Sequence, residues 1–237
     1  MIACNCAVCG KTEFRDQKVL WPELISEWEL ASHEVEYIDR QQGTCCIGCG
    51  AQLRANALAK AIGRVLQTNQ TLREIVVDRR YQELRILDLN GCLAVSETLA
   101  ALPGYVRADY PSVDMMAMHY PDSTFDLVVH SDTLEHIPDP VRALRECLRV
   151  VSEAGAVCYT IPIIVERLSR SRAGMPKSFH GKVGSDAEDF IVHTEFGSDF
   201  WTYPLKAGAH SVEICTAEFP AAQAITLRRS GAWNNPE

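Results

Sequence analysis

Short apolar runs alternate with segments of helical apolar spacing through the second half of the chain. The short runs have the length of buried strands, and the segments between them carry apolar residues every three or four positions. Strands that alternate with helices in this way form a mostly parallel sheet covered on both faces. The pattern therefore predicts an α/β fold with a doubly wound, Rossmann-like sheet. The strands are expected at 84–89, 104–109, 125–130, 156–161, 192–194, 212–215 and 224–227, and the helices at 95–102, 139–155 and 199–207.

The N-terminal third has a different pattern. Residues 21–30 have the spacing of a short amphipathic helix, and 51–67 that of a longer helix with an apolar stripe. We therefore expect a small N-terminal module with a trailing helix, 1–67, and a larger domain, 68–237. Within the larger domain, the glycine- and proline-containing polar stretch 166–190 predicts a long loop.

Charge is distributed unevenly along the 237 residues. The net charge is −8, but residues 1–80 hold 10 basic and 10 acidic side chains, so the acidic excess lies in 81–237. A surface that follows phosphates would need the opposite sign, which disfavours nucleic acid as the main partner. No apolar run approaches the roughly 20 residues of a membrane span, and the N-terminus lacks the pattern of a secretory signal. We therefore expect a cytoplasmic protein.

The ten cysteines fall into two groups. Six lie within the first 49 residues, and among them the pattern Cys-x-x-Cys-Gly occurs twice. A two-residue gap lets both thiolates of one turn point at one ion, so the two pairs predict a closed, structural zinc site in a module like a treble clef or zinc ribbon. Cys4 and Cys45 lie beside the pairs and remain open as alternative ligands. The predicted ligands are Cys6, Cys9, Cys46 and Cys49, and the other cysteines are expected to be small buried side chains.

Acidic residues follow the predicted strands of the larger domain. Asp88 ends the first of these strands, Asp109 ends the second, and Asp114 comes five residues later. Ligands of parallel sheets bind where the strands end, and a carboxylate at the second strand end can accept hydrogen bonds from both hydroxyls of a ribose. The alternative is that Asp109 and Asp114 only cap turns.

Residues 114–136 read DMMAMHYPDSTFDLVVHSDTLEH, and 148–155 read LRVVSEAG. These stretches resemble the class I S-adenosylmethionine-dependent methyltransferases of type 11. The resemblance covers about 84–162 and extends loosely over 190–227. It implies a methyltransferase that binds S-adenosylmethionine. A cysteine module before such a domain also resembles a subgroup of bacterial methyltransferases found near sugar- and glycan-modifying enzymes.

The resemblance implies a role for several residues of this chain. Asp109 would hold the ribose hydroxyls, and Asp114 would accept a hydrogen bond from the adenine amine. Met115 would lie against the adenine ring, and His130 near the methionine part of the cofactor. For Met115 and His130, a plain role in the core is the alternative.

The turn after the first strand departs from the family pattern. The family has D-x-G-x-G-x-G, whereas residues 88–94 read DLNGCLA. Asn90 tolerates the left-handed region, and Gly91 adopts it freely, so Asp88, Asn90 and Gly91 are still expected to form the cofactor turn. Cys92 is expected to be a small filler there.

We expect methyl transfer to a small-molecule acceptor, most simply O-methylation of a sugar, glycan or related metabolite. An oxygen acceptor needs a general base, and histidine suits that role near neutral pH. His180 is the first candidate and His136 the second. Two alternatives stay open: methylation of RNA or protein with the zinc module as the recognition element, and a non-catalytic scaffold that has lost cofactor binding. The further candidates for the base are His193, Glu195 and Tyr159.

Overall fold

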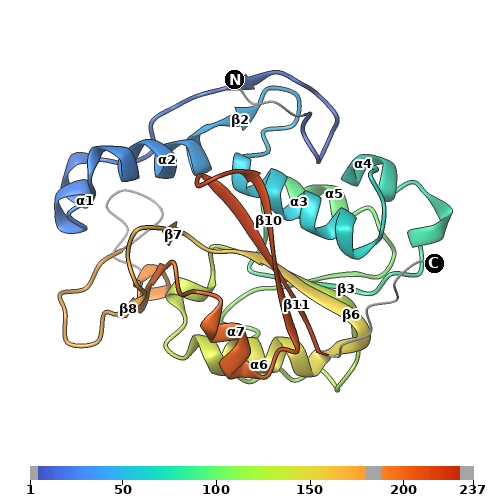
Figure 1. Ribbon diagram of the computed structural model, residues 1–237. Coiled ribbons are helices and arrows are strands. Elements are labelled where there is room, and N and C mark those ends of the chain that lie inside the picture. Colours follow the sequence, from blue (N-terminus) through green and yellow to red (C-terminus); the bar gives the residue numbers. More distant parts are fainter. Residues whose placement is uncertain (1–4, 180–187, 230–237) are drawn as a thin grey trace.

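A computed structural model of the chain describes residues 5–179 and 188–229 (Figure 1). Its main sheet has six strands in the order β10-β11-β6-β5-β3-β4. The four strands β6, β5, β3 and β4 are parallel, and β11 and β10 add an antiparallel pair to one edge. The predicted α/β class is confirmed. The strands are β3 (Ile86–Leu89), β4 (Tyr105–Ala108), β5 (Phe125–Ser131), β6 (Val151–Thr160), β10 (Ser211–Glu218) and β11 (Ala222–Arg228).

Helices cover both faces of this sheet, as Figure 1 shows. On one face α3 packs across β10, β11 and β6, beside α5 and α4; on the other face α6 and α7 pack together. Two apolar clusters fill the spaces between the sheet and these two helical layers. The helices are α3 (Leu53–Val65), α4 (Leu72–Ile75), α5 (Ala94–Leu99), α6 (Pro140–Val150) and α7 (Thr202–Ala207), with the 3₁₀ turns η1 (Arg79–Tyr81) and η2 (Leu134–His136).

The start of α6 follows its sequence signals, but its end does not. Asp139 accepts a hydrogen bond from the backbone N–H of Arg142 at 3.0 Å, and Pro140 occupies the first turn. The helix was expected to end near Gly155; that prediction is wrong, because β6 already begins at Val151. A Cβ atom at Gly155 would lie 2.6 Å from the carbonyl oxygen of Asp126, so the glycine allows a close approach within the sheet.

The N-terminal segment contains a helix and two short strands that the sequence did not predict. Between the two cysteine pairs the chain forms the expected α1 (Pro22–Glu27) and then α2 (Ser32–Gly43). The short strands β1 (Phe14–Arg15) and β2 (Cys45–Cys46) pair antiparallel beside them. The apolar cluster under α3 includes Cys6 and Cys46 as well as residues of the main sheet, so the core is continuous across the N-terminal part and the sheet. The division of domains at residue 67 stays a prediction.

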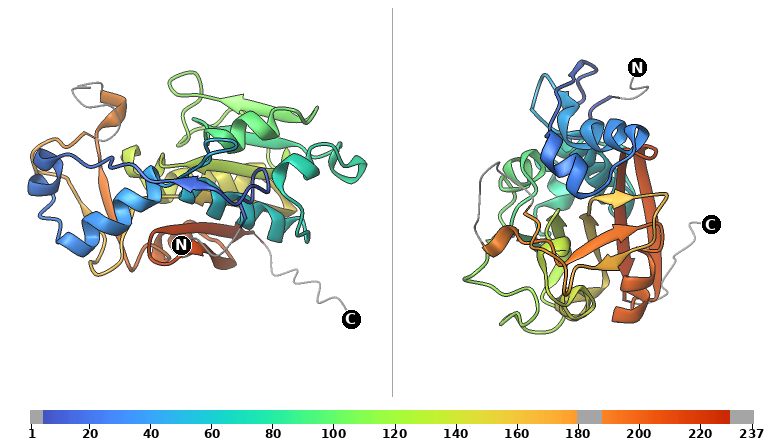
Figure 2. Two further views of the ribbon diagram at one scale, coloured as in Figure 1. Left: turned by 90° about the horizontal axis from the view of Figure 1, so that it is seen from above. Right: turned by 90° about the vertical axis from the view of Figure 1, so that its left-hand side faces the viewer.

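A second, small sheet follows β6. Its order is β7-β9-β8, from β7 (Ile163–Ile164), β8 (Arg170–Ser171) and β9 (Thr194–Gly197), and the 3₁₀ turn η3 (Glu188–Phe190) precedes β9. The stretch expected to be a long loop thus holds a strand and a turn. Figure 2, right, shows α1 and α2 in blue above this small sheet in orange.

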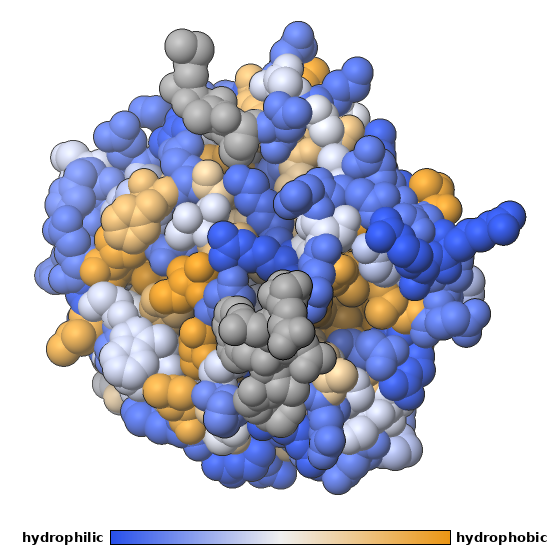
Figure 3. Space-filling model, turned by 45° about the vertical axis from the view of Figure 1, so that its right-hand side comes forward, coloured by the Kyte–Doolittle hydropathy of each residue, from blue (hydrophilic) through white to orange (hydrophobic). Residues whose placement is uncertain are grey.

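No helix among residues 5–179 and 188–229 is long and apolar enough to cross a membrane. On the face seen in Figure 3, hydrophobic side chains form several small groups separated by hydrophilic ones.

Candidate functional site

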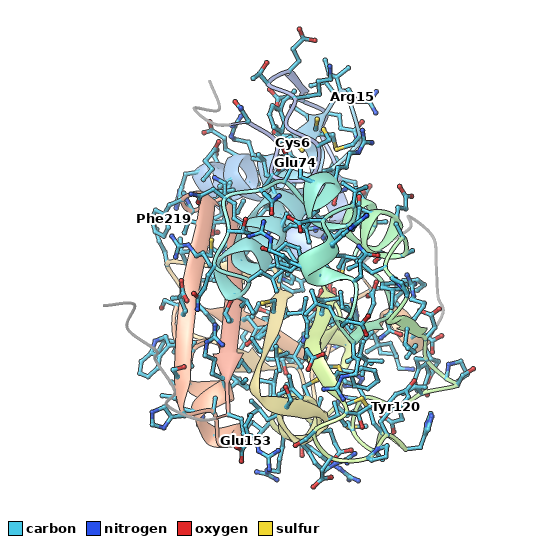
Figure 4. The ribbon with its side chains drawn as sticks, turned by 90° about the vertical axis from the view of Figure 1, so that its right-hand side faces the viewer. Cys6, Arg15, Glu74, Tyr120, Glu153 and Phe219 are labelled. Atoms are coloured by element: carbon cyan, nitrogen blue, oxygen red, sulfur yellow. The ribbon has the colours of Figure 1, made fainter. Side chains whose placement is uncertain are left out.

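Four cysteine side chains converge in the N-terminal part (Cys6 is labelled in Figure 4). The Sγ atoms of Cys6, Cys9, Cys46 and Cys49 all lie within 4.8 Å of one another. The Cys6–Cys49 and Cys9–Cys46 sulfur pairs are each 3.6 Å apart. Zinc–sulfur bonds of about 2.3 Å put the sulfurs of a tetrahedral site about 3.8 Å apart, so the cluster has the dimensions of a zinc site.

Each cysteine pair is held by the same kind of turn. The N–H of Gly10 donates to the carbonyl of Cys6 at 2.7 Å, and that of Gly50 donates to the carbonyl of Cys46 at 2.8 Å. Both glycines have positive φ, 80° and 72°, which glycine adopts without strain. Cys45 is not part of the cluster, since its thiol faces the carbonyl oxygen of Gln42 at 3.7 Å. Cys4 lies outside the described residues.

The turn after β3 is closed by its own side chains. Asp88 is fully buried; its carboxylate accepts hydrogen bonds from the hydroxyls of Ser96 and Tyr105, the latter at 2.6 Å, and faces the thiol of Cys92 at 3.5 Å. Asn90 has a positive φ of 59°, as the sequence predicted for this turn. The Asp88 carboxylate therefore stabilises the turn from within. Since its oxygens are already hydrogen-bonded, a ligand at this turn would have to contact the backbone.

The neighbouring strand end brings Asp109 to the same edge. The N–H of Tyr110, the next residue, donates to Oδ1 of Asn90 at 2.8 Å, which joins the two turns. Asp109 accepts a hydrogen bond from Nε of Arg107 at 2.5 Å. The guanidinium of Arg107 also occupies the space in which a Cβ at Gly91 would lie. Asn90, Gly91 and Asp109 thus meet at one place, with Arg107 lying across it.

Asp114 and Met115 follow in the loop after β4. Oδ1 of Asp114 accepts the N–H of Met116 at 2.8 Å, which is a turn-capping contact. Met115 is 2% exposed and belongs to the apolar cluster on the α6 face. Their roles toward an adenine ring stay predictions.

His130 is paired in register with Leu89, at the end of β5. Its ring stacks on that of Tyr159 with centroids 4.6 Å apart, and neither ring nitrogen has a hydrogen-bond partner among the described residues. Complete burial lowers the pKa of His130 to about 3, so the ring is neutral. Contact of His130 with a cofactor stays a prediction.

A cavity of about 250 Å³ lies between the N-terminal segment and the small sheet. Most of its lining is apolar, and the polar members are few. The lining comprises Val19, Leu20, Trp21, Leu24, Trp28, Leu30, Ile38, Gln42, Glu135, Pro162, Ile163, Ile164, Thr194, Glu195 and Phe196. Enclosed, mainly apolar cavities with a few polar groups are typical of small-molecule sites.

Two arginines fix the N-terminal wall of this cavity. Arg167 donates to the carboxylate of Glu34 and to the carbonyl oxygen of Trp28 at 2.8 Å. The guanidinium of Arg172 lies 5.5 Å from the ring centroid of Trp28 and donates to Glu195 at 2.5 Å. The Trp28 indole N–H in turn donates to the hydroxyl of Ser178 at 2.9 Å. The wall is therefore tied to the small sheet by charge and by hydrogen bonds.

Glu135 is one of the two acidic residues of the described chain that line the cavity. It is 2% exposed, and its Oε2 has no hydrogen-bond partner in the described part of the chain. Burial raises the pKa of Glu135 to about 7, although the positive charge of Arg54 opposes this rise. Arg54 pairs with Asp132 at the end of β5, and Gln42 of the cavity donates to Asp132 at 3.4 Å. These contacts join the cavity to the edge where β5 ends.

The histidines predicted as bases lie differently. His180 is outside the described residues, so its role stays a prediction. His136 is only partly buried; its Nδ1 contacts the carbonyl oxygen of Ile191 at 3.1 Å and its Nε2 lies 3.7 Å from Oε1 of Glu135. Burial lowers the pKa of His136. Among the further candidate bases, Glu195 has both carboxylate oxygens bound by arginines. The backbone N–H of His193 donates to the carbonyl of Glu135.

Arg54, Asp132 and Glu135 lie at or beside the cavity, and no motif of the sequence predicted them there. Asp132 follows β5 at its carboxyl end with a positive φ of 45°, so the rule that ligands bind at strand ends could have found it. Arg54 interrupts an apolar helix, which is the mark of a partnered buried charge. Glu135 gave no local signal beyond its place in the resembling stretch.

Residues 45–159 match a family model described as a methyltransferase domain. This part of the chain is therefore similar to methyltransferase domains. A probable S-adenosylmethionine-dependent methyltransferase of Mycobacterium tuberculosis is 33% identical over 87 residues, which are 32% of this chain and 31% of that protein. The ubiquinone biosynthesis O-methyltransferase of Albidiferax ferrireducens is 29% identical over 133 residues, 56% of this chain and 42% of that protein.

The chain spans about a third to a half of the length of the curated relatives it matches. Among solved structures, the trans-methyltransferase CalH in complex with SAH is similar over 86% of this chain and 60% of that chain, with 13% identity and a TM-score of 0.42.

Proposed function

We propose that this chain transfers the methyl group of S-adenosylmethionine to an oxygen of a small molecule held in the cavity between the N-terminal segment and the small sheet. The observation that carries the proposal is the cavity itself, which adjoins the end of β5 through Gln42, Asp132 and Arg54. Methyl transfer needs donor and acceptor in line and shielded from water, and a mainly apolar cavity beside a strand end supports the shielding of the acceptor.

The residues at the end of β3 and β4 fit a nucleoside cofactor. The left-handed backbone at Asn90 and Gly91 leaves peptide groups of the turn open to close approach. The carboxylate of Asp109 can accept hydrogen bonds from two hydroxyls, which Asp88 cannot because its oxygens are already bound. When bound, the sulfonium of S-adenosylmethionine would supply the methyl group. Asp109 would hold the ribose, and the turn would orient the rest.

Zinc is proposed as a structural metal. Four thiolates complete a tetrahedral shell and leave no open position for chemistry. The chain between the two pairs contains α1 and α2, and these helices supply the N-terminal wall of the cavity. In this proposal the metal fixes the two ends of that wall and takes no part in methyl transfer.

The acceptor class is a finer part of the proposal. Ubiquinone biosynthesis O-methyltransferases among the relatives support an oxygen acceptor on a small molecule. A sugar or glycan, which the sequence analysis favoured, carries several hydroxyls that each need a partner when buried. The cavity offers only Gln42, Glu135, Thr194 and Glu195 as polar lining side chains, and Glu195 is taken by arginines. The lining therefore supports an acceptor with fewer polar groups.

One observation favours the non-catalytic alternative. The guanidinium of Arg107 lies across Gly91 and pairs with Asp109, so it covers the surface that a cofactor would use. A methyltransferase needs this side chain to turn aside, whereas a scaffold that has lost its cofactor does not.

Calorimetric titration of the purified protein with S-adenosylmethionine and with S-adenosylhomocysteine distinguishes the two. The methyltransferase proposal expects saturable binding of both at a stoichiometry near one. Absence of binding for both compounds, in protein that is folded by circular dichroism, would overturn the proposal and leave the scaffold.

A further inference from the structure

We propose that Glu135 receives the proton of the acceptor hydroxyl and that the acceptor is a phenol carried on one or two apolar rings. The proposal rests on the proposed methyl transfer and adds to it the residue that handles the proton and the chemical class of the acceptor. It is carried by one residue, Glu135, which lines a mainly apolar cavity and has a buried carboxylate oxygen without a hydrogen-bond partner among the described residues.

The first step is the state of Glu135. Four buried side-chain atoms of the described residues have no hydrogen-bond partner, two on His130, one on Arg172 and Oε2 of Glu135. Of these three residues only Glu135 lines the cavity. A buried polar atom without a partner costs about 1–3 kcal/mol, so such atoms in folded proteins call for an explanation. A ligand hydroxyl in the cavity would supply the missing partner.

The second step is the set of charged groups around Glu135. Arg54 approaches from α3, and its own partner is Asp132 at the end of β5. His136, on the same turn, lies 3.7 Å from Oε1, and its Nδ1 contacts the carbonyl of Ile191. From the small sheet, Glu195 lines the same cavity but is neutralised by two arginines. Oε1 thus lies near His136, and Oε2 is the carboxylate oxygen without a hydrogen-bond partner in the described part of the chain.

The third step is the acidity of the acceptor. With its pKa near 7, Glu135 is a stronger base than an ordinary carboxylate. A phenol has a pKa of about 10, so a base with a pKa near 7 can accept its proton as the C–O bond forms. An aliphatic alcohol is about as weak an acid as water, with a pKa of about 16, and the same base would serve it poorly. The chemistry of Glu135 therefore favours a phenolic hydroxyl over a sugar hydroxyl.

The fourth step is the shape and lining of the cavity. Trp21, Trp28 and Phe196 contribute aromatic surface, and leucine and isoleucine side chains supply most of the rest. Aromatic rings favour aromatic ligands through offset and edge contacts. A cavity of about 150 Å³ admits benzene, so the volume of about 250 Å³ here suits one or two fused rings.

The proposed reaction balances with these groups alone and the methyl donor. The acceptor oxygen forms a bond to the methyl carbon while the bond between that carbon and the sulfonium sulfur breaks, and the sulfur keeps the electron pair. The O–H proton passes to Oε2 of Glu135, which leaves it to water after the product departs. No oxidant, reductant or metal is required.

The test uses the full chain with zinc bound and three probes: phenol, 2-naphthol and methyl glucoside. Binding of each probe without cofactor is measured by calorimetry and by quenching of tryptophan fluorescence, and methyl transfer from S-adenosylmethionine is measured for each. The variant Glu135→Gln keeps the shape and removes the base. Its control, Glu153→Gln, changes an exposed carboxyl near the start of β6, at the end of the molecule away from the cysteine cluster (Figure 4).

We expect 2-naphthol to bind and to be methylated, with methyl glucoside inert. Glu135→Gln should lower turnover by about 10²- to 10⁴-fold at unchanged affinity for S-adenosylmethionine, and should abolish the fall in parental rate below pH 7. Glu153→Gln should behave as the parent. Parental turnover in Glu135→Gln, or binding of methyl glucoside but of neither phenol, would overturn the inference. If S-adenosylmethionine itself does not bind, the proposed function fails instead, and phenol binding still tests the acceptor class.

Discussion

Arg167 and Glu34 form an ion pair between two segments that are 133 residues apart, with Nη2 of Arg167 2.5 Å from Oε2 of Glu34. Glu34 lies at the start of α2, and its side chain is 4% exposed. Arg167 follows the short strand β7 and also donates to the carbonyl oxygens of Trp28 and Glu29. This one guanidinium therefore fastens the N-terminal wall of the cavity to the small sheet.

Replacement of Arg167 by alanine should loosen that wall. The Glu34 carboxylate would remain buried without its cation, which should cost about 2–3 kcal/mol, less than for a fully buried pair because Arg167 is partly exposed. In the enzyme, KM for the acceptor should rise at least 10-fold while the affinity for S-adenosylmethionine stays within a factor of two. Denaturant unfolding measures the loss of stability, calorimetry measures the affinity for S-adenosylmethionine, and initial rates at varied acceptor concentration give KM. The exposed pair of Arg80 and Asp78 supplies the control: Arg80→Ala should change neither quantity.

The pH dependence of this pair follows from the pKa of Glu34. Burial acts to raise that pKa, but hydrogen bonds from Arg167 and from the backbone of Ala31 lower it overall. A carboxyl whose pKa is depressed in the folded state stabilises the fold above its unfolded pKa, near 4.3, and loses this contribution as the pH falls through the folded value. The free-energy difference between parent and Arg167→Ala should therefore be constant from pH 8 to 5 and shrink below about pH 4. A difference that persists unchanged at pH 3 would contradict the assignment.

The cysteine cluster makes a prediction about metal and cavity together. Purified protein should contain about one equivalent of zinc, and Cys46→Ser should lose it. Because the wall of the cavity lies between the two cysteine pairs, Cys46→Ser should also lose binding of 2-naphthol. The matched control is Cys45→Ser, since the Cys45 thiol is directed to the carbonyl of Gln42 and not to the cluster. Equal metal content in the two variants would remove the cluster as the zinc site.

Features with a local signal were predictable from the sequence. The cysteine cluster follows from two five-residue repeats, and the left-handed turn at Asn90 follows from one residue and its neighbour. The strands of the main sheet follow from short apolar runs. Gly155 misled the analysis because a glycine after a helical stripe has two explanations, a helix end or a close approach of strands, and only the neighbouring Asp126 decides between them.

Features that depend on distant segments were not predictable. Trp28 and Ser178 are 150 residues apart and hydrogen-bonded, so no local pattern indicates the cavity that Trp28 lines. The raised pKa of Glu135 arises from complete burial, and the charge that opposes the rise comes from Arg54, 81 positions earlier in the chain. The sequence directed attention to histidines because their ordinary pKa suits a base, whereas burial here lowers the pKa of His136 and raises that of Glu135.

Substitution of Asp109 and substitution of Arg107 should affect the affinity for S-adenosylmethionine differently. Loss of a charge-assisted hydrogen bond to a bound ligand costs about 1.5–3 kcal/mol, so Asp109→Ala should weaken binding of S-adenosylmethionine about 10- to 100-fold. Asp114→Ala should do the same if Asp114 holds the adenine amine. Arg107→Ala should not weaken binding, because it frees both Gly91 and Asp109. Calorimetry on the three variants decides: weaker binding in Arg107→Ala would mean that this guanidinium contacts the cofactor instead of covering its site.

Glu135 also predicts how stability depends on pH, apart from any activity. Its folded pKa of about 7 lies above the unfolded value of about 4.3. Between these values the folded protein holds a proton that the unfolded chain has lost, so stability falls as the pH rises through this window. The penalty reaches about 4 kcal/mol above pH 7, at roughly 1.4 kcal/mol for each pH unit between the two pKa values.

Glu135→Gln should remove this penalty, since the amide stays neutral at every pH. The variant should therefore be close to the parent near pH 4.5 and exceed its free energy of unfolding by about 3–4 kcal/mol at pH 8, measured by urea denaturation at both values. The gain at pH 8 would accompany the loss of turnover, as expected where a buried acid is kept for chemistry at the expense of stability. A variant that is less stable than the parent at pH 8 would show that the Glu135 carboxylate is satisfied within the fold, and that it is not held in reserve for a ligand.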